Sequence, residues 1–82
     1  MDIHAVRKRI RVRREDSAFV YFVLEAHEGV TSYSTLEYRP EDLHRDLELL
    51  YSPEFAGDVE RILRGLSRMI YPLPGTEVAP GA

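Results

Sequence analysis

Arginines recur at every second position of a short run near the start of the chain, and they are the residues best suited to bind a ligand. They are Arg7, Arg9, Arg11 and Arg13. Because side chains of a β-strand alternate between its two faces, this spacing places all four guanidinium groups on one face of a sheet. A guanidinium group binds carboxylates and phosphates through parallel hydrogen bonds. The arginine stripe is therefore a candidate anion-binding surface.

A second predicted strand offers the arginines a structural role instead. Residues 45–51 alternate in polarity, so that Asp46 and Glu48 share one face. If this strand lies beside the first, these acids stand next to the arginines, and each pair contributes about 0.2–1 kcal/mol. We favour this ion-paired interpretation, since exposed charge runs usually serve solubility. The deciding feature is whether Arg9 and Arg11 are paired or free.

Other residue types capable of catalysis or metal binding are scattered. The histidines are far apart, at His4, His27 and His44. Glu25 and Glu28 lack the spacing that places two ligands on one helical face, so we expect His27 to interact with a helix C-terminus. Residues 65–69 resemble only the first half of a nucleophile elbow. We therefore expect no catalytic residue, metal site or cofactor, and no enzyme.

The composition is typical of one small soluble domain. The chain has 82 residues, of which 44% are hydrophobic and 30% charged. It has no cysteine, which is compatible with a reducing cytoplasm. The longest apolar run, residues 18–24, is too short to span a membrane. We expect a cytoplasmic protein with no membrane partner.

Nucleic-acid binding is disfavoured by charge and by aromatic content. The net charge is −3, although residues 1–14 hold six of the eleven lysines and arginines. Binders of nucleic acid usually have a basic domain. Sheets that bind RNA also stack bases on aromatic side chains, and only Tyr33 is expected on the open face. A nucleic-acid partner is therefore not expected.

Five elements are predicted to position these residues. They are a strand at residues 4–13, a helix beginning at Asp16 or Ser17 and ending near Gly29, strands at 30–38 and 45–51, and a helix that starts at Ser52-Pro53 and continues to residue 70. A turn at residues 39–42 joins the last two strands. The stripe expected to face the core in the first helix is Ala18, Phe19, Phe22, Val23 and Ala26. Val20 and Leu24 widen the apolar arc, so we expect part of this helix to contact a partner.

The order β-α-β-β-α predicts an α+β fold. A right-handed crossover makes the first two strands parallel, and the hairpin inserts the third between them. This is the split βαβ of ferredoxin-like folds, with three strands, two helices on one face and the fourth strand absent. Residues 1–71 are predicted to form the domain. Residues 72–82, which hold three prolines and two glycines, are predicted to be a flexible tail.

Several core and cap positions carry a family resemblance. They are Ile10-Arg11-Val12, Ala18-Phe19, Phe22 to Ala26, Glu28-Gly29, Thr35-Leu36, Tyr51-Ser52-Pro53 and Asp58-Val59-Glu60. Across residues 8–70 the chain resembles a family of small uncharacterised bacterial proteins related in shape to ACT domains. The resemblance implies a regulatory module. ACT domains often bind amino acids through a glycine-containing loop after the first strand, whereas residues 13–17 here contain no glycine.

A homodimer is expected, because so short a chain buries little more than half of its unfolded surface. Antiparallel pairing of two first strands would bring arginines together, which is destabilising. We therefore expect association through the uncharged edge at residues 31–35 or the flank of the first helix, with Val20, Leu24 and Tyr33 as candidate contacts. The expected function is a small non-enzymatic ACT-like regulatory or protein-interaction module. The alternative is a binder of an anionic small molecule or nucleic acid through the arginine stripe.

Overall fold

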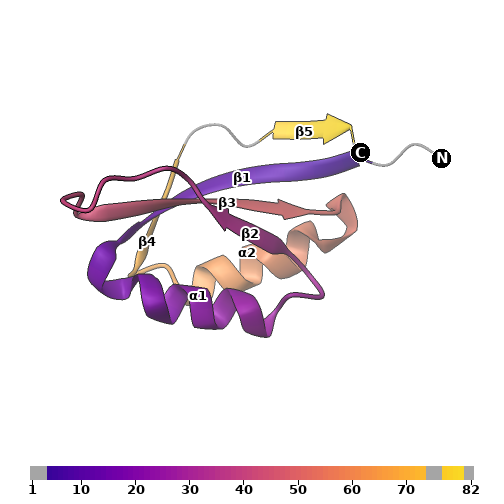
Figure 1. Cartoon of the computed structure of the whole chain (residues 1–82). Coiled ribbons are helices and arrows are strands. Elements are labelled where there is room, and N and C mark those ends of the chain that lie inside the picture. Colours follow the sequence, from indigo (N-terminus) through magenta and orange to yellow (C-terminus); the bar gives the residue numbers. More distant parts are fainter. Residues whose placement is uncertain (1–3, 74–76, 81–82) are drawn as a thin grey trace.

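The first strand is the centre of the sheet. The computed structural model describes residues 4–73 and 77–80. Its strands are β1 (His4–Arg13), β2 (Ser32–Thr35), β3 (His44–Tyr51), β4 (Ile70–Pro72) and β5 (Glu77–Pro80). The sheet order is β2-β3-β1-β4, with β5 also pairing with β1, and every pairing is antiparallel (Figure 1). The predicted insertion of the third strand between the first two is confirmed.

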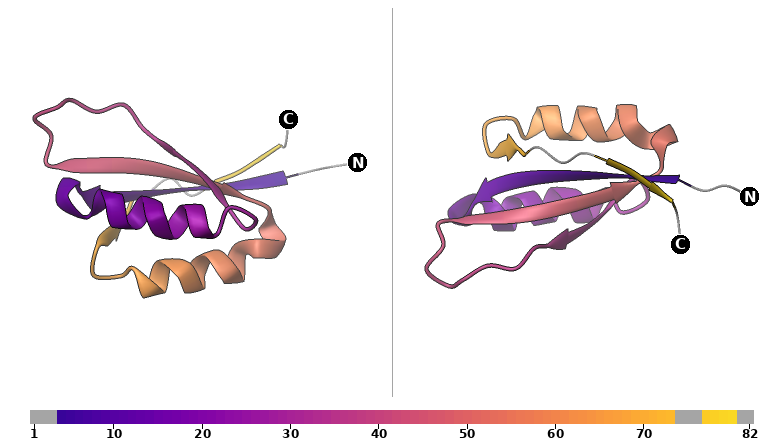
Figure 2. Two further views of the ribbon diagram at one scale, coloured as in Figure 1. Left: turned by 60° about the horizontal axis from the view of Figure 1, so that its bottom comes forward. Right: turned by 90° about the horizontal axis from the view of Figure 1, so that it is seen from above.

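Two helices cover one face of this sheet (Figures 1 and 2). Helix α1 is Ser17–Ala26 and follows a 3-10 turn at Arg14–Asp16; helix α2 is Ala56–Gly65 and follows a 3-10 turn at Pro53–Phe55. Pro53 stands in the first turn, where its missing N–H costs nothing. Among the described residues, no helix lies on the other face of the sheet. An α+β, ferredoxin-like fold is thus confirmed.

The core lies between the sheet and the helices. Its buried members are Ile10, Val12, Val20, Leu24, Leu47, Leu49, Tyr51, Val59, Leu63, Leu66 and Ile70. On β3 the buried side chains alternate with more exposed ones, as the sequence predicted. The sheet therefore has one buried face and one face open to solvent.

The predicted absence of a fourth strand is wrong. Helix α2 ends at Gly65, and a turn closed by a hydrogen bond from Met69 N to Leu66 O (2.8 Å) reverses the chain. Ile70 then pairs with β1 as part of β4. Leu66 and Ile70 are both buried in the core. Their spacing of four residues is also the spacing of one helical face, so the sequence predicted that the helix continues to residue 70, whereas the chain has already turned.

The segment predicted to be a flexible tail also contributes to the sheet. Val78, within β5, pairs with Val6 along the first half of β1. Both β4 and β5 therefore cover the edge of β1 that an absent fourth strand would have left open. Pro72 is compatible with this position, because an edge strand tolerates a residue without an amide N–H. Residues 74–76 and 81–82 of that predicted tail lie outside the described residues.

Neither helix in the described part of the chain has the length and apolarity needed to cross a bilayer.

The connection between β2 and β3 contains the predicted turn. Asp42 N donates to Arg39 O at 3.0 Å, and Arg39 N donates back to Asp42 Oδ2 at 2.9 Å. The guanidinium of Arg45 lies 3.7 Å from the centre of the Tyr38 ring and holds this connection against β3.

Candidate functional site

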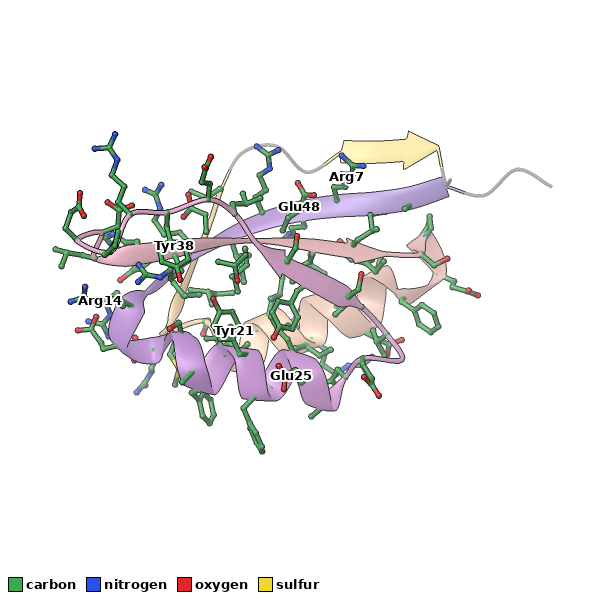
Figure 3. All side chains as sticks on the ribbon, in the orientation of Figure 1. Arg7, Arg14, Tyr21, Glu25, Tyr38 and Glu48 are labelled. Atoms are coloured by element: carbon green, nitrogen blue, oxygen red, sulfur yellow. The ribbon has the colours of Figure 1, made fainter. Side chains whose placement is uncertain are left out.

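The arginine stripe lies on the helix-free face of the sheet. Figure 3 shows Arg7 and Glu48 on the side away from the helices. Arg9 Nε is 3.2 Å from Glu48 Oε2. Arg11 makes two parallel hydrogen bonds to Asp46, of 2.8 and 3.1 Å. The β1–β3 register brings both pairs together, and the ion-paired interpretation is confirmed for Arg9 and Arg11.

These contacts neutralise most of the stripe. The hydrogen bond from Arg11 holds the pKa of Asp46 below its usual value, and it raises the pKa of Arg11 in return. Arg13 donates to Asp16 at 3.1 Å, which raises the pKa of Arg13. An anion at these three arginines would have to compete with carboxylates already in place. Because Arg9 and Arg11 are paired, the structure disfavours an anion site at these residues.

Helix α1 faces the sheet with a different stripe from the one predicted. Val20 and Leu24 are fully buried in the core, so they are unavailable as partner contacts. Phe19 and Phe22, predicted to be inside, are 50% and 69% exposed. The run from residue 18 to residue 24 contains no charged residue, so polarity along the helix could not show which side faces solvent.

A tyrosine cluster fixes this rotation of α1. The rings of Tyr21 and Tyr33 stack with centroids 5.4 Å apart, and the Tyr21 hydroxyl lies 2.9 Å from Thr35 Oγ1. The Tyr33 hydroxyl donates to Glu25 at 2.7 Å. Figure 3 shows Tyr21 reaching from α1 toward the sheet. Tyr33 therefore faces α1, and its predicted position on the helix-free face is wrong.

Burial of the Tyr33 ring, reinforced by the hydrogen bond to Glu25, raises the pKa of Tyr33 to about 12. The phenol is therefore a neutral donor at physiological pH. Because its hydroxyl is committed to Glu25 and its ring to Tyr21, Tyr33 ties β2 to α1. The expectation that Tyr33 also contacts a partner stays a prediction.

A groove opens between α1 and α2. Its volume is about 390 Å³. Its lining residues are Phe19, Val23, His27, Val30, Asp58, Arg61, Ile62, Gly65 and Leu66. Most are apolar, and the polar groups come from His27, Asp58 and Arg61. A concave apolar site with a few polar groups is the usual form of a binding site.

The polar residues beside the groove have internal partners. Arg61 lies 3.2 Å from Asp58 one turn earlier in α2. His27 Nδ1 is 2.8 Å from the carbonyl oxygen of Val23, so this side chain meets the C-terminus of α1 as predicted. Among the described residues, no three His, Asp or Glu side chains come close enough to hold a metal ion.

No protein-family model and no curated protein sequence matches the chain. Solved structures do. A PII-like nitrogen regulatory protein from Thiomonas intermedia K12, solved with ADP, AMP and bicarbonate, matches with a TM-score of 0.63 and 9% identity over 100% of this chain and 97% of that one. The C-terminal domain of MgtC from Mycobacterium tuberculosis matches with a TM-score of 0.58 and 15% identity over 96% and 88% of the two chains.

A designed protein, Foldit4, matches with a TM-score of 0.50 and 22% identity over 95% of this chain and 92% of that chain. Identities this low establish a shared fold. The chain is therefore a small ferredoxin-like α+β domain, a fold it shares with a PII-like regulatory protein.

Sequence reasoning identified the arginine stripe and its acidic neighbours but missed the groove. The groove depends on Phe19 and Val23 from α1 facing Ile62 and Gly65 from α2. The available signal was the absence of charge from Ser17 to Leu24, which leaves Glu25 as the one charged residue of α1. A helix with so wide an apolar surface is normally covered on more than one side.

Proposed function

We propose that this chain is a small regulatory or protein-interaction module that acts by binding another protein chain through its helix layer and catalyses no reaction. The observation that carries this proposal is the apolar surface on the outer side of α1, which Glu25 borders. Its exposed apolar residues are Ala18, Phe19, Phe22 and Ala26. Contiguous apolar surface of this kind on a small domain is characteristic of a protein contact.

Two further features support the proposal. The groove beside α1 provides a concave apolar surface of the kind that accepts a side chain or a helix face. The fold is shared with a protein described as nitrogen regulatory, which is consistent with a regulatory module. Three of the four arginines of the stripe, Arg9, Arg11 and Arg13, are ion-paired, so they do not favour a second function.

Photo-crosslinking in cells of the organism that makes this protein tests the proposal. A benzophenone amino acid placed at position 22 should give a discrete protein adduct. The same group at position 43 should give none, because Leu43 is comparably exposed (66%) but lies in the β2–β3 connection. The adduct should also weaken when Phe19→Asp is added. Equal labelling from both positions, or no adduct from position 22, would contradict a binding role for the helix layer.

A further inference from the structure

The most exposed large apolar side chain on α1 lies beside the groove. Phe22 is 69% exposed, and it follows Phe19, which forms part of the groove wall, by three positions. Residues three apart on a helix are neighbours on its surface. A projecting side chain and an apolar depression therefore occupy the same face of the molecule.

We propose that the helix layer is the interface of a two-fold symmetric homodimer, in which Phe22 of each copy inserts into the groove between α1 and α2 of the other. This inference rests on the proposed function and specifies its partner. In an isologous interface, the same patch must carry both the projecting group and its receptor. The juxtaposition of Phe22 and the groove meets this condition, whereas a different partner would not require it.

Charge complementarity also favours a second copy. At the C-terminal end of α1, beyond Phe22, the exposed charged residues are Glu25 and Glu28, whereas Arg13, Arg14 and Glu15 are exposed before its N-terminus. The exposed cations of α2 and the turn that follows it are Arg61, Arg64 and Arg68, and the acid Glu60 is exposed beside them. Arg61 retains 75% exposure of its side chain despite its contact with Asp58. When α1 of one copy lies over the groove of the other, Glu25 and Glu28 of the first copy approach the arginines of α2 in the second. The two-fold axis repeats this attraction on the other side of the interface.

The edge of β2 is a weaker candidate for this contact. β2 has only four residues, Ser32–Thr35, and three of them are small hydroxyl residues. Pairing two such short strands would form few backbone hydrogen bonds and bury little apolar surface. Tyr33, the large residue of β2, is already stacked on Tyr21. The helix layer offers much more apolar surface than the β2 edge.

Analytical ultracentrifugation of the purified full chain over a range of concentrations tests the homodimer. The wild type should show a reversible monomer–dimer equilibrium. Phe22→Asp should raise its dissociation constant at least about ten-fold, because a charge would enter an apolar groove. Leu43→Asp is the matched control on another surface and should leave the constant unchanged. Circular dichroism should show that each variant is folded.

A second variant tests the groove without altering Phe22. A Cβ added at Gly65 would meet no atom within 4 Å, and Gly65 lines the groove. Gly65→Leu should therefore fill the groove, leave the monomer folded and weaken the dimer. A monomeric wild type at every concentration, or a dimer unchanged by both Phe22→Asp and Gly65→Leu, would overturn the inference.

Different outcomes would contradict the homodimer and the protein-interaction module. If the purified chain is monomeric but position 22 crosslinks to a different protein in the host, self-association is wrong and the interaction module stands. If position 22 crosslinks to nothing in either setting, both are wrong. If it crosslinks to the α2 segment of a second copy, the homodimer is supported directly.

Discussion

At the scale of residues, two polar pairings characterise the molecule. Arg11 and Asp46 form a two-bonded ion pair on the open face of the sheet. Tyr33 and Glu25 form a hydrogen bond on the side of the sheet facing the helices. The first joins the neighbouring strands β1 and β3. The second joins a short edge strand to a helix.

The Arg11–Asp46 pair should make stability fall in acid. Because the pKa of Asp46 is lower in the folded chain than in the unfolded one, its contribution is present above the unfolded pKa and is lost as the pH falls through the folded pKa. Asp46→Asn should lower the free energy of unfolding at pH 7 by less than about 1 kcal/mol, and the variant should lose less stability than the wild type as the pH falls. Urea unfolding as a function of pH measures both effects. An equal loss of stability in acid for the wild type and Asp46→Asn would contradict the role given to this ion pair.

Tyr33 should produce a corresponding effect in alkali. Its folded pKa of about 12 lies above the usual 10.0, so its contribution is full below pH 10 and is lost as the pH rises toward about 12. Tyr33→Phe should reduce the alkaline loss of stability, measured by denaturant unfolding between these pH values. Tyr38→Phe, on the exposed β2–β3 connection, serves as the control. An identical alkaline slope in wild type and Tyr33→Phe would refute the prediction.

At the scale of elements, the rotation of α1 separates core from surface. Val20 and Leu24 fill the space above the sheet, while Phe19 and Phe22 are left on the outer side. The tyrosine cluster explains this choice, because the hydroxyls of Tyr21 and Tyr33 reach their partners only when the Val20–Leu24 stripe faces inward. The exposed phenylalanines follow from that rotation and create the candidate interface.

Substitutions on the two sides of α1 should have unequal effects. Leu24→Ala should lower the free energy of unfolding by about 2–5 kcal/mol, because it leaves a cavity in the core. Phe22→Ser should change it by no more than about 0.5 kcal/mol. Chemical denaturation at a concentration that keeps both variants monomeric measures the difference. The reverse order would mean that α1 packs with the stripe predicted from the sequence.

At the scale of the whole molecule, the C-terminal strands complete the sheet. β5 pairs with the first half of β1 and β4 with its second half, so β1 is covered on both edges by strands from distant parts of the chain. The edges that the described residues leave open are those of short strands. Edges of this kind are poor templates for association, which leaves the helix layer as the main apolar surface.

A chain ending at Leu73 tests this arrangement. The truncation removes β5, so amides of β1 at residues 4–7 should exchange with solvent faster. Amides at residues 10–12, which pair with β4, should keep more of their protection and serve as the internal control. Hydrogen exchange followed by mass spectrometry measures both segments. Unchanged protection at residues 4–7 would show that β5 does not cover β1 in solution.

Much of this molecule was determined by the sequence itself. Alternation along residues 4–13 and 45–51 predicted two of the sheet strands and the single face that Asp46 and Glu48 share, because strand periodicity is a local property. The same alternation placed Asp46 and Glu48 beside the arginines once the hairpin was recognised. The helix after Ser52 was also evident from its proline and its apolar spacing.

Only the tertiary structure decided the rest. Local patterns cannot orient a helix that has a single charged residue near its end, so the rotation of α1 depended on contacts with Tyr33 and Thr35 from another element. The short strands β4 and β5 carry proline and weak periodicity, and only pairing with β1 gives them strand geometry. The groove needs two helices at a particular separation, and that separation is set by the sheet on which both pack.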